Sequence, residues 1–399
     1  MFNAIDVLKP EFTARNCAEI WPLISPLYAV DESQWLAQLL PLAEPSVDEL
    51  TNTTSSATDL IKQVRADENA IQMIDALLLE YSLDTHEGIL LMCLAEALMR
   101  IPDAETADAL IRDKLSVADW KSHLKNSDSL FVNASTWGLM LTGKVVTLDS
   151  DEDGNPSNVI NRLVNKFSEP VIRKAMHQAM KIMGFQFVLG RNMGEALKRG
   201  KNYRDKGYTY SFDMLGEAAL TAADAAKYLK AYEQAIDSVG ADQYEGKAPR
   251  PTISIKLSAL HSRYEVGQEE RVMTELFSAV QGLIIKARGK NVGITIDAEE
   301  ADRLDLSLDV IEAVLSRPEL AGWNGFGVVV QAFGHRAPFV LDWLYSLSVQ
   351  LDRKIMVRLV KGAYWDAEVK RAQVMGLNGF PVFTRKVNTD VSYMACATK

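Results

Sequence analysis

Six polar or charged side chains each close a short apolar run in the second half of the chain, and these residues are the best suited to do chemistry. They are Asp213, Lys256, Asp297, Gln331, Arg358 and Lys386. A lysine can bind a carboxylate or form a Schiff base, and a fixed arginine can stabilise developing negative charge. Buried acid–base pairs can also be purely structural, but six such residues in equivalent positions favour an active site.

The elements that must position these residues are predicted from apolar runs that alternate with amphipathic helices after residue 207. The runs, interpreted as strands, span residues 208–214, 252–257, 293–297, 327–331, 355–359 and 381–386. Strands that alternate with helices along a chain predict parallel strands joined by crossovers. The sequence therefore predicts the α/β class and a TIM-like (β/α)8 barrel.

Side-chain alternation predicts the face on which each residue lies. In the run 252–257, the apolar side chains share one face and leave Ser254 and Lys256 on the other. The same count puts the last polar residue of each other run on the inner face, at the carboxyl end of its strand. Active sites of (β/α)8 barrels are built on that rim.

The composition bounds the class of protein. The chain has 399 residues, of which 48% are hydrophobic, and a formal net charge of −10. Such a chain can bury a large core, and its acidic balance argues against sequence-independent nucleic-acid binding. The three cysteines are widely spaced, so we expect neither a disulfide nor a metal site. We also expect no secretory signal and no membrane-spanning segment.

The first half of the chain has helical patterns. Residues 1–45 predict an N-terminal helical arm. Residues 46–184 combine Ser, Thr or Asp helix starts with apolar faces, which predicts a helical domain and a linker. Its expected helices include residues 103–115, 130–141 and 158–182. The barrel is expected in residues 185–399.

Six ordered motifs resemble the proline dehydrogenase domain of the bacterial bifunctional proline utilization A (PutA) family. They lie at residues 212–217, 253–260, 294–303, 328–333, 357–366 and 383–390, and the fifth reads VRLVKGAYWD. The resemblance runs from about residue 185 to the last residue. The helical first half is similar to the arm and α-domain that precede the barrel in this family.

The resemblance implies an FAD-dependent enzyme of proline catabolism. It would oxidise L-proline to Δ1-pyrroline-5-carboxylate by hydride transfer to flavin N5 and pass the electrons to a membrane quinone, ubiquinone or menaquinone. It also implies a cytoplasmic protein that can associate peripherally with the inner membrane. The full-length parent is expected to be a homodimer.

The resemblance further implies the roles of individual residues. Lys256, Arg358 and Asp297 would be catalytic, with Lys256 on the proline carboxylate and Arg358 on the flavin ring. Substrate would contact Lys256, Asp297, Ala298, Leu359, Ala363 and Tyr364, and Glu217 would be half of an ion-pair gate. The cofactor would contact Asp297, Ala298, Gln331, Arg358, Lys361, Gly362, Ala363, Tyr364, Trp365, Thr384 and Lys386.

Parts of the family pattern have no counterpart in this sequence. Eight strand–helix units need more chain than residues 208–399 supply, so the barrel is predicted to stop after about six strands, with its C-terminal part missing. The family's final helix with paired arginines is not found, and we expect no DNA-binding domain and no aldehyde dehydrogenase domain. If these 399 residues are the whole molecule, we expect an open sheet edge and weak or absent turnover.

Two other functions fit part of the pattern. Lys256 at the end of a barrel strand could form a Schiff base with a carbonyl substrate, as in a TIM-barrel aldolase. The chain could instead be a non-catalytic fragment whose helical half mediates dimerisation.

Overall fold

The computed structural model describes residues 15–66, 103–115 and 188–399, with single positions between 86 and 101. These residues fall into two compact units. One unit combines the chain up to Ser46 with Gly190–Lys399, and the other lies within Val47–Leu189. All of the predicted site residues belong to the first unit, so its strands and helices are the ones that position the site.

The second unit contributes two long described helices, α4 (Val47–Ala66) and α7 (Ala104–Leu115). Both carry acidic residues in the first turn, where they favour the helix dipole. The helical prediction is confirmed for these two segments. The helices predicted at 130–141 and 158–182 lie outside the described residues. No described helix is long and apolar enough to cross a membrane.

Five parallel strands form the sheet of the first unit. They are β1 (Ser211–Asp213), β2 (Thr252–Ile255), β3 (Ile294–Ile296), β4 (Phe326–Gln331) and β5 (Ile355–Val360). Their order in the sheet is β1-β2-β3-β4-β5, so β1 and β5 are its edges. Parallel neighbours in sequence order need a crossover between each pair, as the strand–helix alternation predicted. The prediction of an α/β fold with a parallel sheet is confirmed.

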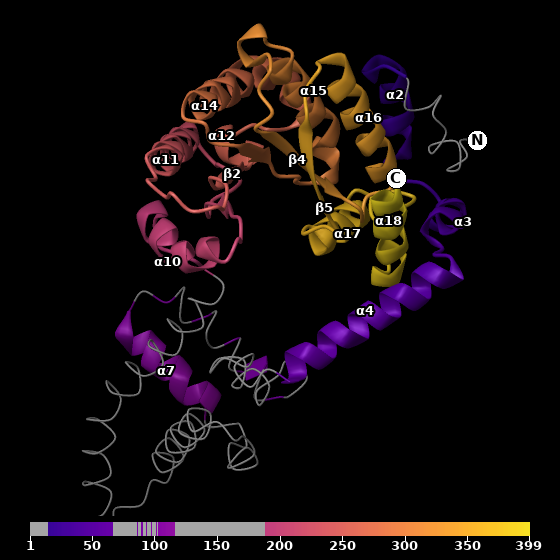
Figure 1. Cartoon of the computed structure of the whole chain (residues 1–399), viewed down its shortest axis with the longest axis horizontal. Helices are drawn as coiled ribbons and strands as arrows, with labels where there is room; N and C mark the ends of the chain where they lie inside the picture. Colours follow the sequence, from indigo (N-terminus) through magenta and orange to yellow (C-terminus); the bar gives the residue numbers. More distant parts are fainter. Residues whose placement is uncertain are drawn as a thin grey trace, which may run out of the picture. The chain divides into compact units, whose positions relative to one another are not determined.

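Helices line one side of this sheet, and Figure 1 shows α11, α14, α15 and α16 as an arc around the strands. The longer helices are α10 (Met193–Asp205), α11 (Ala222–Gly240), α14 (Phe277–Gly289), α15 (Leu304–Leu315), α16 (Ala337–Gln350), α17 (Trp365–Val374) and α18 (Lys386–Thr398). Shorter helical segments are α12 (Leu257–Leu260), α13 (Glu269–Arg271), a π-helical Val272–Leu276, and 3-10 turns at Ser25–Leu27, Val266–Gln268, Ala301–Arg303 and Pro318–Leu320.

The apolar core lies between the strands and this arc of helices. Ile253 and Ile255 of β2 and Ile294 and Ile296 of β3 are buried there. Because side chains alternate along a strand, burying these residues on the helix side turns the polar residues of β2 and β3 to the opposite, inner face.

The predicted sixth strand at 381–386 is wrong. Val382 forms only an isolated antiparallel bridge to Gly334, and Lys386 is the first residue of α18. Val382 and Phe383 are fully buried, which explains the strand-like pattern. The backbone N–H of Thr384 donates to the carboxylate of Glu32, so a side chain takes the donor that a strand ladder would use.

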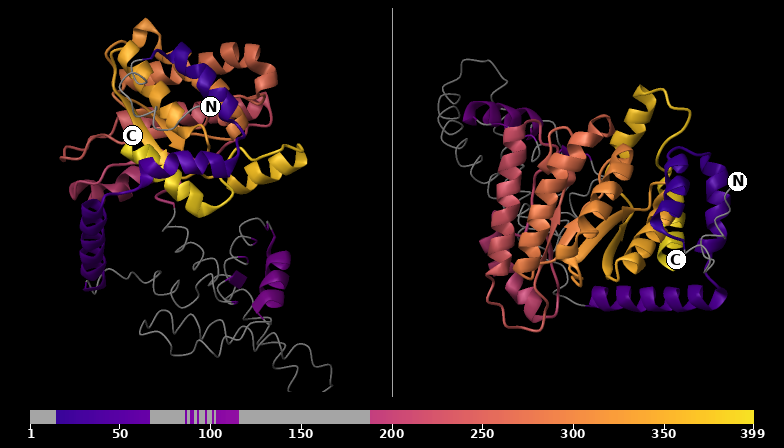
Figure 2. Two further views of the ribbon diagram at one scale, coloured as in Figure 1. Left: turned by 90° about the vertical axis from the view of Figure 1, so that its right-hand side faces the viewer. Right: turned by 90° about the horizontal axis from the view of Figure 1, so that it is seen from above.

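The N-terminal segment of this unit forms two helices, α2 (Cys17–Ile24) and α3 (Glu32–Ala43), whose N-caps are Asn16 and Asp31. The prediction that residues in this segment are helical is confirmed. In Figure 2 these indigo helices lie beside the C-terminal helices, with α2 against α16 and α3 against α18. Trp35 of α3 stacks on Phe339 of α16 with ring centroids 6.0 Å apart.

Leu39 and Leu40 provide a matched test of how α3 docks. Leu39 is fully buried, whereas Leu40 is 48% exposed. Because truncating a buried leucine removes its contacts and leaves a cavity, we expect Leu39→Ala to lower the free energy of unfolding by about 2–4 kcal/mol. Leu40→Ala should lower it by no more than about 1 kcal/mol. Urea denaturation measures both values, and equal losses would contradict the docked position of α3.

Candidate active site at the carboxyl ends of the strands

Lys256, directly after β2, lies between two carboxylates from the neighbouring strands. Its Nζ is 3.1 Å from both oxygens of Asp213, at the end of β1, and 3.0 Å from Oδ2 of Asp297, which follows β3. The strands are in register, with Asp213 opposite Ser254. Parallel pairing therefore brings together residues that are about forty positions apart in sequence.

Arg358 reaches the same cluster from β5, the strand at the opposite edge of the sheet. Its Nη2 lies 3.2 Å from Asp297 Oδ1 and donates to Ser254 Oγ at 2.6 Å. Two strands separate β2 from β5, so a flat sheet would hold them three strand spacings apart, about 14 Å. An arginine side chain cannot span that distance. The sheet must therefore curve toward this inner face.

The cluster is charge-neutral and unevenly exposed. The side chains of Lys256 and Asp297 are 15% and 13% exposed, while that of Asp213 is 50% exposed. Burial alone lowers the pKa of Lys256, but the adjacent Asp297 and Asp213 carboxylates outweigh burial, so the pKa is raised above its ordinary value. The amine is therefore protonated at neutral pH. Because a Schiff base forms from the neutral amine, this pairing disfavours the aldolase alternative.

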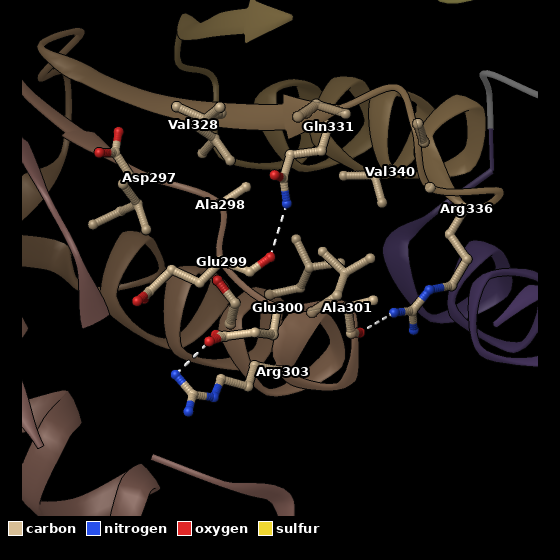
Figure 3. A pocket seen from close by; sticks show the side chains of 18 of the residues that line it. Asp297, Ala298, Glu299, Glu300, Ala301, Arg303, Val328, Gln331, Arg336 and Val340 are labelled. Atoms are coloured by element: carbon tan, nitrogen blue, oxygen red, sulfur yellow. Dashed lines mark hydrogen bonds and ion pairs between the residues drawn. The ribbon is translucent and has the colours of Figure 1, made fainter. Parts of the chain in front are cut away.

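A pocket lies beside the cluster, at the carboxyl ends of β3 and β4 (Figure 3). Its walls include Asp297, Ala298, Glu299, Gln331 and Arg336, together with apolar side chains of β4 and α16. The Gln331 side chain points across the pocket, and its Nε2 donates to the backbone oxygen of Glu299 at 2.8 Å. Its Oε1 accepts from the backbone N–H of Ala363 at 3.2 Å. Gln331 therefore ties the end of β3 to the loop after β5.

The loop after β1 is held to the loop after β3 through Ser258. The carboxylate of buried Glu299 accepts hydrogen bonds from the backbone N–H and hydroxyl of Ser258. Ser258 Oγ accepts from the backbone N–H of Ala218 at 2.9 Å. Burial raises the pKa of Glu299 in spite of these donors. This chain of contacts fixes the backbone next to Glu217.

Glu217 lies on that loop and reaches the loop after β5. Its Oε2 accepts a hydrogen bond from the hydroxyl of Tyr364 at 3.0 Å. Burial, and then the charge of Glu217, raise the pKa of Tyr364, so the phenol is the donor at neutral pH. The two residues form a bridge over the strand ends.

The loop after β5 is tied to the start of α18 at two points. Trp365 Nε1 donates to the backbone oxygen of Phe383 at 2.8 Å, and Lys361 Nζ pairs with Asp390 Oδ1 at 2.5 Å. Between them, Gly362 has φ of +135°, and a Cβ on it would lie 2.5 Å from the ring of Phe333. Only glycine therefore fits this bend without strain.

The structure separates some of the predicted site residues from the cluster. Leu359 pairs with Val330 in register and alternates with Arg358, so it lies on the helix-facing side and not with the predicted substrate contacts. Thr384 and Lys386 are on the segment that starts α18, and Lys386 is exposed there. Ala298 lines the pocket.

Sequence reasoning missed several residues that support the cluster. The hydroxyl of Tyr232, on α11, accepts the backbone N–H of Lys256 at 3.3 Å, and Glu299 and Ser258 form the contact described above. None of these residues ends an apolar run, so a search for polar residues at the ends of predicted strands could not find them. Ser254 was placed on the inner face by alternation, but its bond to Arg358 was not foreseen. Among the described residues, no group of His, Cys, Asp and Glu could hold a metal ion.

Comparison with known proteins identifies the family. Residues 196–399, just over half of the chain, match the family model described as "Proline dehydrogenase". The chain belongs to the proline dehydrogenase family. The five strands and the Lys256 cluster all lie inside the matched range, and the resemblance drawn from the six motifs is confirmed.

The curated relatives of this chain are longer proteins. The "Bifunctional protein PutA" of Klebsiella aerogenes is 50% identical over 370 residues, which is 92% of this chain and 28% of that protein. Its counterpart in Escherichia coli strain K12 is 49% identical over 380 residues, 94% of this chain and 29% of that protein. The chain spans less than a third of the length of these curated relatives.

Solved structures show the same relationship. A crystal structure of a Bradyrhizobium japonicum Proline Utilization A (PutA) mutant has a TM-score of 0.64 and 46% sequence identity, and the match covers 93% of this chain and 36% of that chain. The chain therefore carries the proline dehydrogenase domain of the PutA proteins.

The prediction that this chain has no DNA-binding domain is wrong. Residues 73–187 match the family model described as "DNA-binding domain of Proline dehydrogenase". The prediction considered only a ribbon-helix-helix domain at the N-terminus, and the net charge, which averages over all 399 residues, says nothing of a single segment. Most of this range lies outside the described residues.

Lys256 offers a direct test against Schiff-base chemistry. Because its carboxylate partners keep it protonated, incubation with pyruvate and sodium borohydride at pH 7 should leave Lys256 unmodified by mass spectrometry. Exposed lysines provide the background level of labelling. Stoichiometric adduct at Lys256, lost in a Lys256→Met variant, would contradict this assignment.

Gly362 and Gly282 test the bend after β5. A Cβ at Gly362 meets the Phe333 ring and the φ is left-handed, whereas a Cβ at Gly282, inside α14, meets nothing within 4 Å. We expect Gly362→Ala to lower the free energy of unfolding by about 1–3 kcal/mol. Gly282→Ala should raise it by about 0.5–1 kcal/mol, because alanine favours helix. Chemical denaturation gives both signs, and a neutral Gly362→Ala would mean that the bend is not constrained.

Proposed function

We propose that this chain is the FAD-dependent, L-proline-oxidising part of a PutA-type protein. It would convert L-proline to Δ1-pyrroline-5-carboxylate, the first step of proline breakdown toward glutamate. The observation that carries the proposal is the Lys256–Asp297–Arg358 cluster at the carboxyl ends of parallel strands, inside the range that matches the family model. Catalytic groups of (β/α)8 enzymes lie at that position.

We further propose that the five strands are the first part of an eight-stranded barrel. All of their pairings are parallel and in sequence order, and the contact from Arg358 to Ser254 requires a sheet curved toward the polar face. A sheet that curves in this direction, with polar strand ends inside and helices outside, has the geometry of a closing barrel. The edge strand β5, with Met356 and Val357 exposed, would be the place where further strands pair.

Lys256 would bind the substrate carboxylate by exchanging one of its partners. The charges of the two cations and the two carboxylates in the cluster already cancel. A substrate carboxylate can therefore bind Lys256 only if Lys256 gives up one of its present carboxylate partners. Asp213 is half exposed and Asp297 is largely buried, so Asp213 is the carboxylate that can turn away into water at the lower cost. Asp297 would then keep Lys256 and Arg358 in place while substrate binds.

Residues at the carboxyl ends of β4 and β5 and in the loop after β5 fit FAD. Arg358 and Lys361 are cations that suit the flavin carbonyls and the phosphates, and Gln331 keeps one amide N–H beyond its bond to Glu299. Gly362 lets the backbone approach a flat ring system closely. Bound FAD would supply the two-electron acceptor for the reaction. The protein would supply the position of proline, the charge beside the ring, and a site shielded from water.

Tyr364 and Glu217 would control access to this site. Their hydrogen bond joins the loops after β1 and β5 above the strand ends. The loop that carries Glu217 has two strongly exposed leucines, Leu215 and Leu220, at 86% and 85% exposure. Because Ser258 holds the backbone at Ala218, opening for proline would break the Glu217–Tyr364 hydrogen bond and leave the base of the loop in place.

The remaining partners are proposed from the family. A membrane quinone, ubiquinone or menaquinone, would take the electrons at a membrane surface to which the cytoplasmic protein associates peripherally. The longer protein would be a homodimer.

A flavin titration tests the proposed activity. FAD added to the purified chain should bind and show a perturbed visible absorbance, and anaerobic L-proline should bleach it. The same measurement on a form extended to the length of the relatives separates a weak site from a different function. A flavin-free extended form, or one whose flavin L-proline does not reduce, would refute the proposal.

Lys256→Met should weaken proline binding with little change in flavin binding. Loss of one charge-assisted contact corresponds to about a 10- to 100-fold higher proline concentration at half-maximal bleaching. Lys230→Met, an exposed lysine on α11, removes the same charge away from the cluster and should leave the midpoint unchanged. Equal midpoints for both variants would exclude Lys256 as the carboxylate ligand.

A further inference from the structure

The first residue of the arm helix α3, Glu32, is bound to the segment that begins α18. Its carboxylate accepts the backbone N–H of Thr384 at 3.0 and 3.1 Å, the hydroxyl of Thr384 at 2.7 Å, and the side-chain amide of Asn388 at 2.5 Å. These two sites are about 350 positions apart in sequence. One carboxylate thus satisfies three separate donors, two on Thr384 just before α18 and one on Asn388 in the first turn of α18.

Glu32 has the features of a fixed contact. Burial alone raises its pKa, but the donors from Asn388 and Thr384 outweigh burial and lower it, so the carboxylate is ionised at neutral pH. The α3 helix that carries it is held by buried Trp35 and Leu39. The N-cap of α18, Arg385, makes no side-chain capping bond of its own. Glu32 is therefore the side chain that orders this turn.

The turn ordered by Glu32 touches the loop after β5 from both of its ends. At one end, the backbone oxygen of Phe383 accepts from the indole of Trp365. At the other end, Asp390 pairs with Lys361. Trp365, Lys361 and Thr384 are three of the proposed FAD contacts. Thr384 binds Glu32 directly, while Trp365 and Lys361 are connected to Glu32 through the backbone of residues 383–390.

We infer that Glu32 is a positioning residue for the FAD site, supplied by the N-terminal arm, and that the arm is needed for the site to take its bound geometry. The inference rests on the proposed function. Glu32 need not touch the cofactor. It acts by fixing the segment from Phe383 to Asp390, and this segment then fixes Trp365 and Lys361.

The contact also limits what Thr384 can offer to FAD. Its backbone N–H and its hydroxyl proton both go to Glu32. The free capacity of the hydroxyl is then an acceptor lone pair. Thr384 would therefore face a donor group of the cofactor, such as a ribose or ribityl hydroxyl or the adenine amine, while the phosphates are left to lysine and arginine side chains.

Glu32→Ala, with Glu44→Ala as its control, tests the inference. Glu44 is an exposed carboxylate just after the other end of α3, so the control removes the same group without touching α18. Two quantities are measured on the full chain, the dissociation constant of FAD by fluorescence quenching and the amide hydrogen exchange of residues 361–366. Glu32→Ala should weaken FAD binding about tenfold and speed exchange at 361–366, and Glu44→Ala should change neither.

The hydrogen-exchange measurement is made without flavin, so it distinguishes the inference from the proposed function. If the wild-type chain binds no FAD, the proposed function fails, yet faster exchange at 361–366 in Glu32→Ala still supports the positioning role. A variant in which exchange rises only within α3, with FAD affinity and residues 361–366 unchanged, overturns the inference, because Glu32 would then only attach the arm.

Asp390→Asn adds a coupling test. It removes the partner of Lys361 at the far end of the same turn. If Glu32 acts through this turn, the double variant should lose less FAD affinity than the two single losses combined. Additive losses would show that the two residues act independently, which contradicts the proposed route through α18.

Discussion

The placement of Lys256 between Asp213 and Asp297 is the constraint on which the site depends. A buried ammonium group is costly unless carboxylates surround it, and here they come from the two strands that flank β2. The pairing is possible only if the three strands are parallel and in register. Arg358 adds the stronger demand, because its bonds to Asp297 and Ser254 exist only in a curved sheet. The electrostatics of four side chains and the curvature of the sheet therefore depend on each other.

A neutral cluster of this kind contributes little to stability, since desolvation offsets most of the attraction between the charges. Its value is in geometry. Each charged group is held by a partner from another strand, so Lys256 and Arg358 are oriented before any ligand arrives. Asp213 and Asp297 also differ in exposure, so the two carboxylates can play different parts. Asp213 can leave Lys256 and be solvated by water, while Asp297 stays in place. Orientation before binding is what catalysis by positioning and charge requires.

The supports of the cluster come from distant parts of the chain. Tyr232 on α11 holds the backbone of Lys256, and Ser258 and Glu299 fix the loop that carries Glu217. Glu32 supports a neighbouring region, the segment at the start of α18 that contacts the loop after β5. The arm is thus joined to the start of α18 through side-chain hydrogen bonds as well as through apolar packing of α3. In a proline dehydrogenase domain, this makes the helical N-terminal segment part of the architecture of the site.

The sequence by itself determined the parallel α/β fold and the inner face of the strands, because both follow from local alternation: Lys256, Asp297 and Arg358 are found together where strand parity put them. The same alternation predicts that Leu359, next to Arg358 in β5, lies on the outer, helix-facing side of the sheet. Tertiary structure alone decided that residues 381–386 form a turn and not a strand, because the N–H of Thr384 pairs with Glu32, a residue that no local pattern connects to it. It also decided the roles of Tyr232, Ser258 and Glu299. Hydrogen bonds between residues far apart in sequence leave no periodic signal, since periodicity reports only which side of one element is buried.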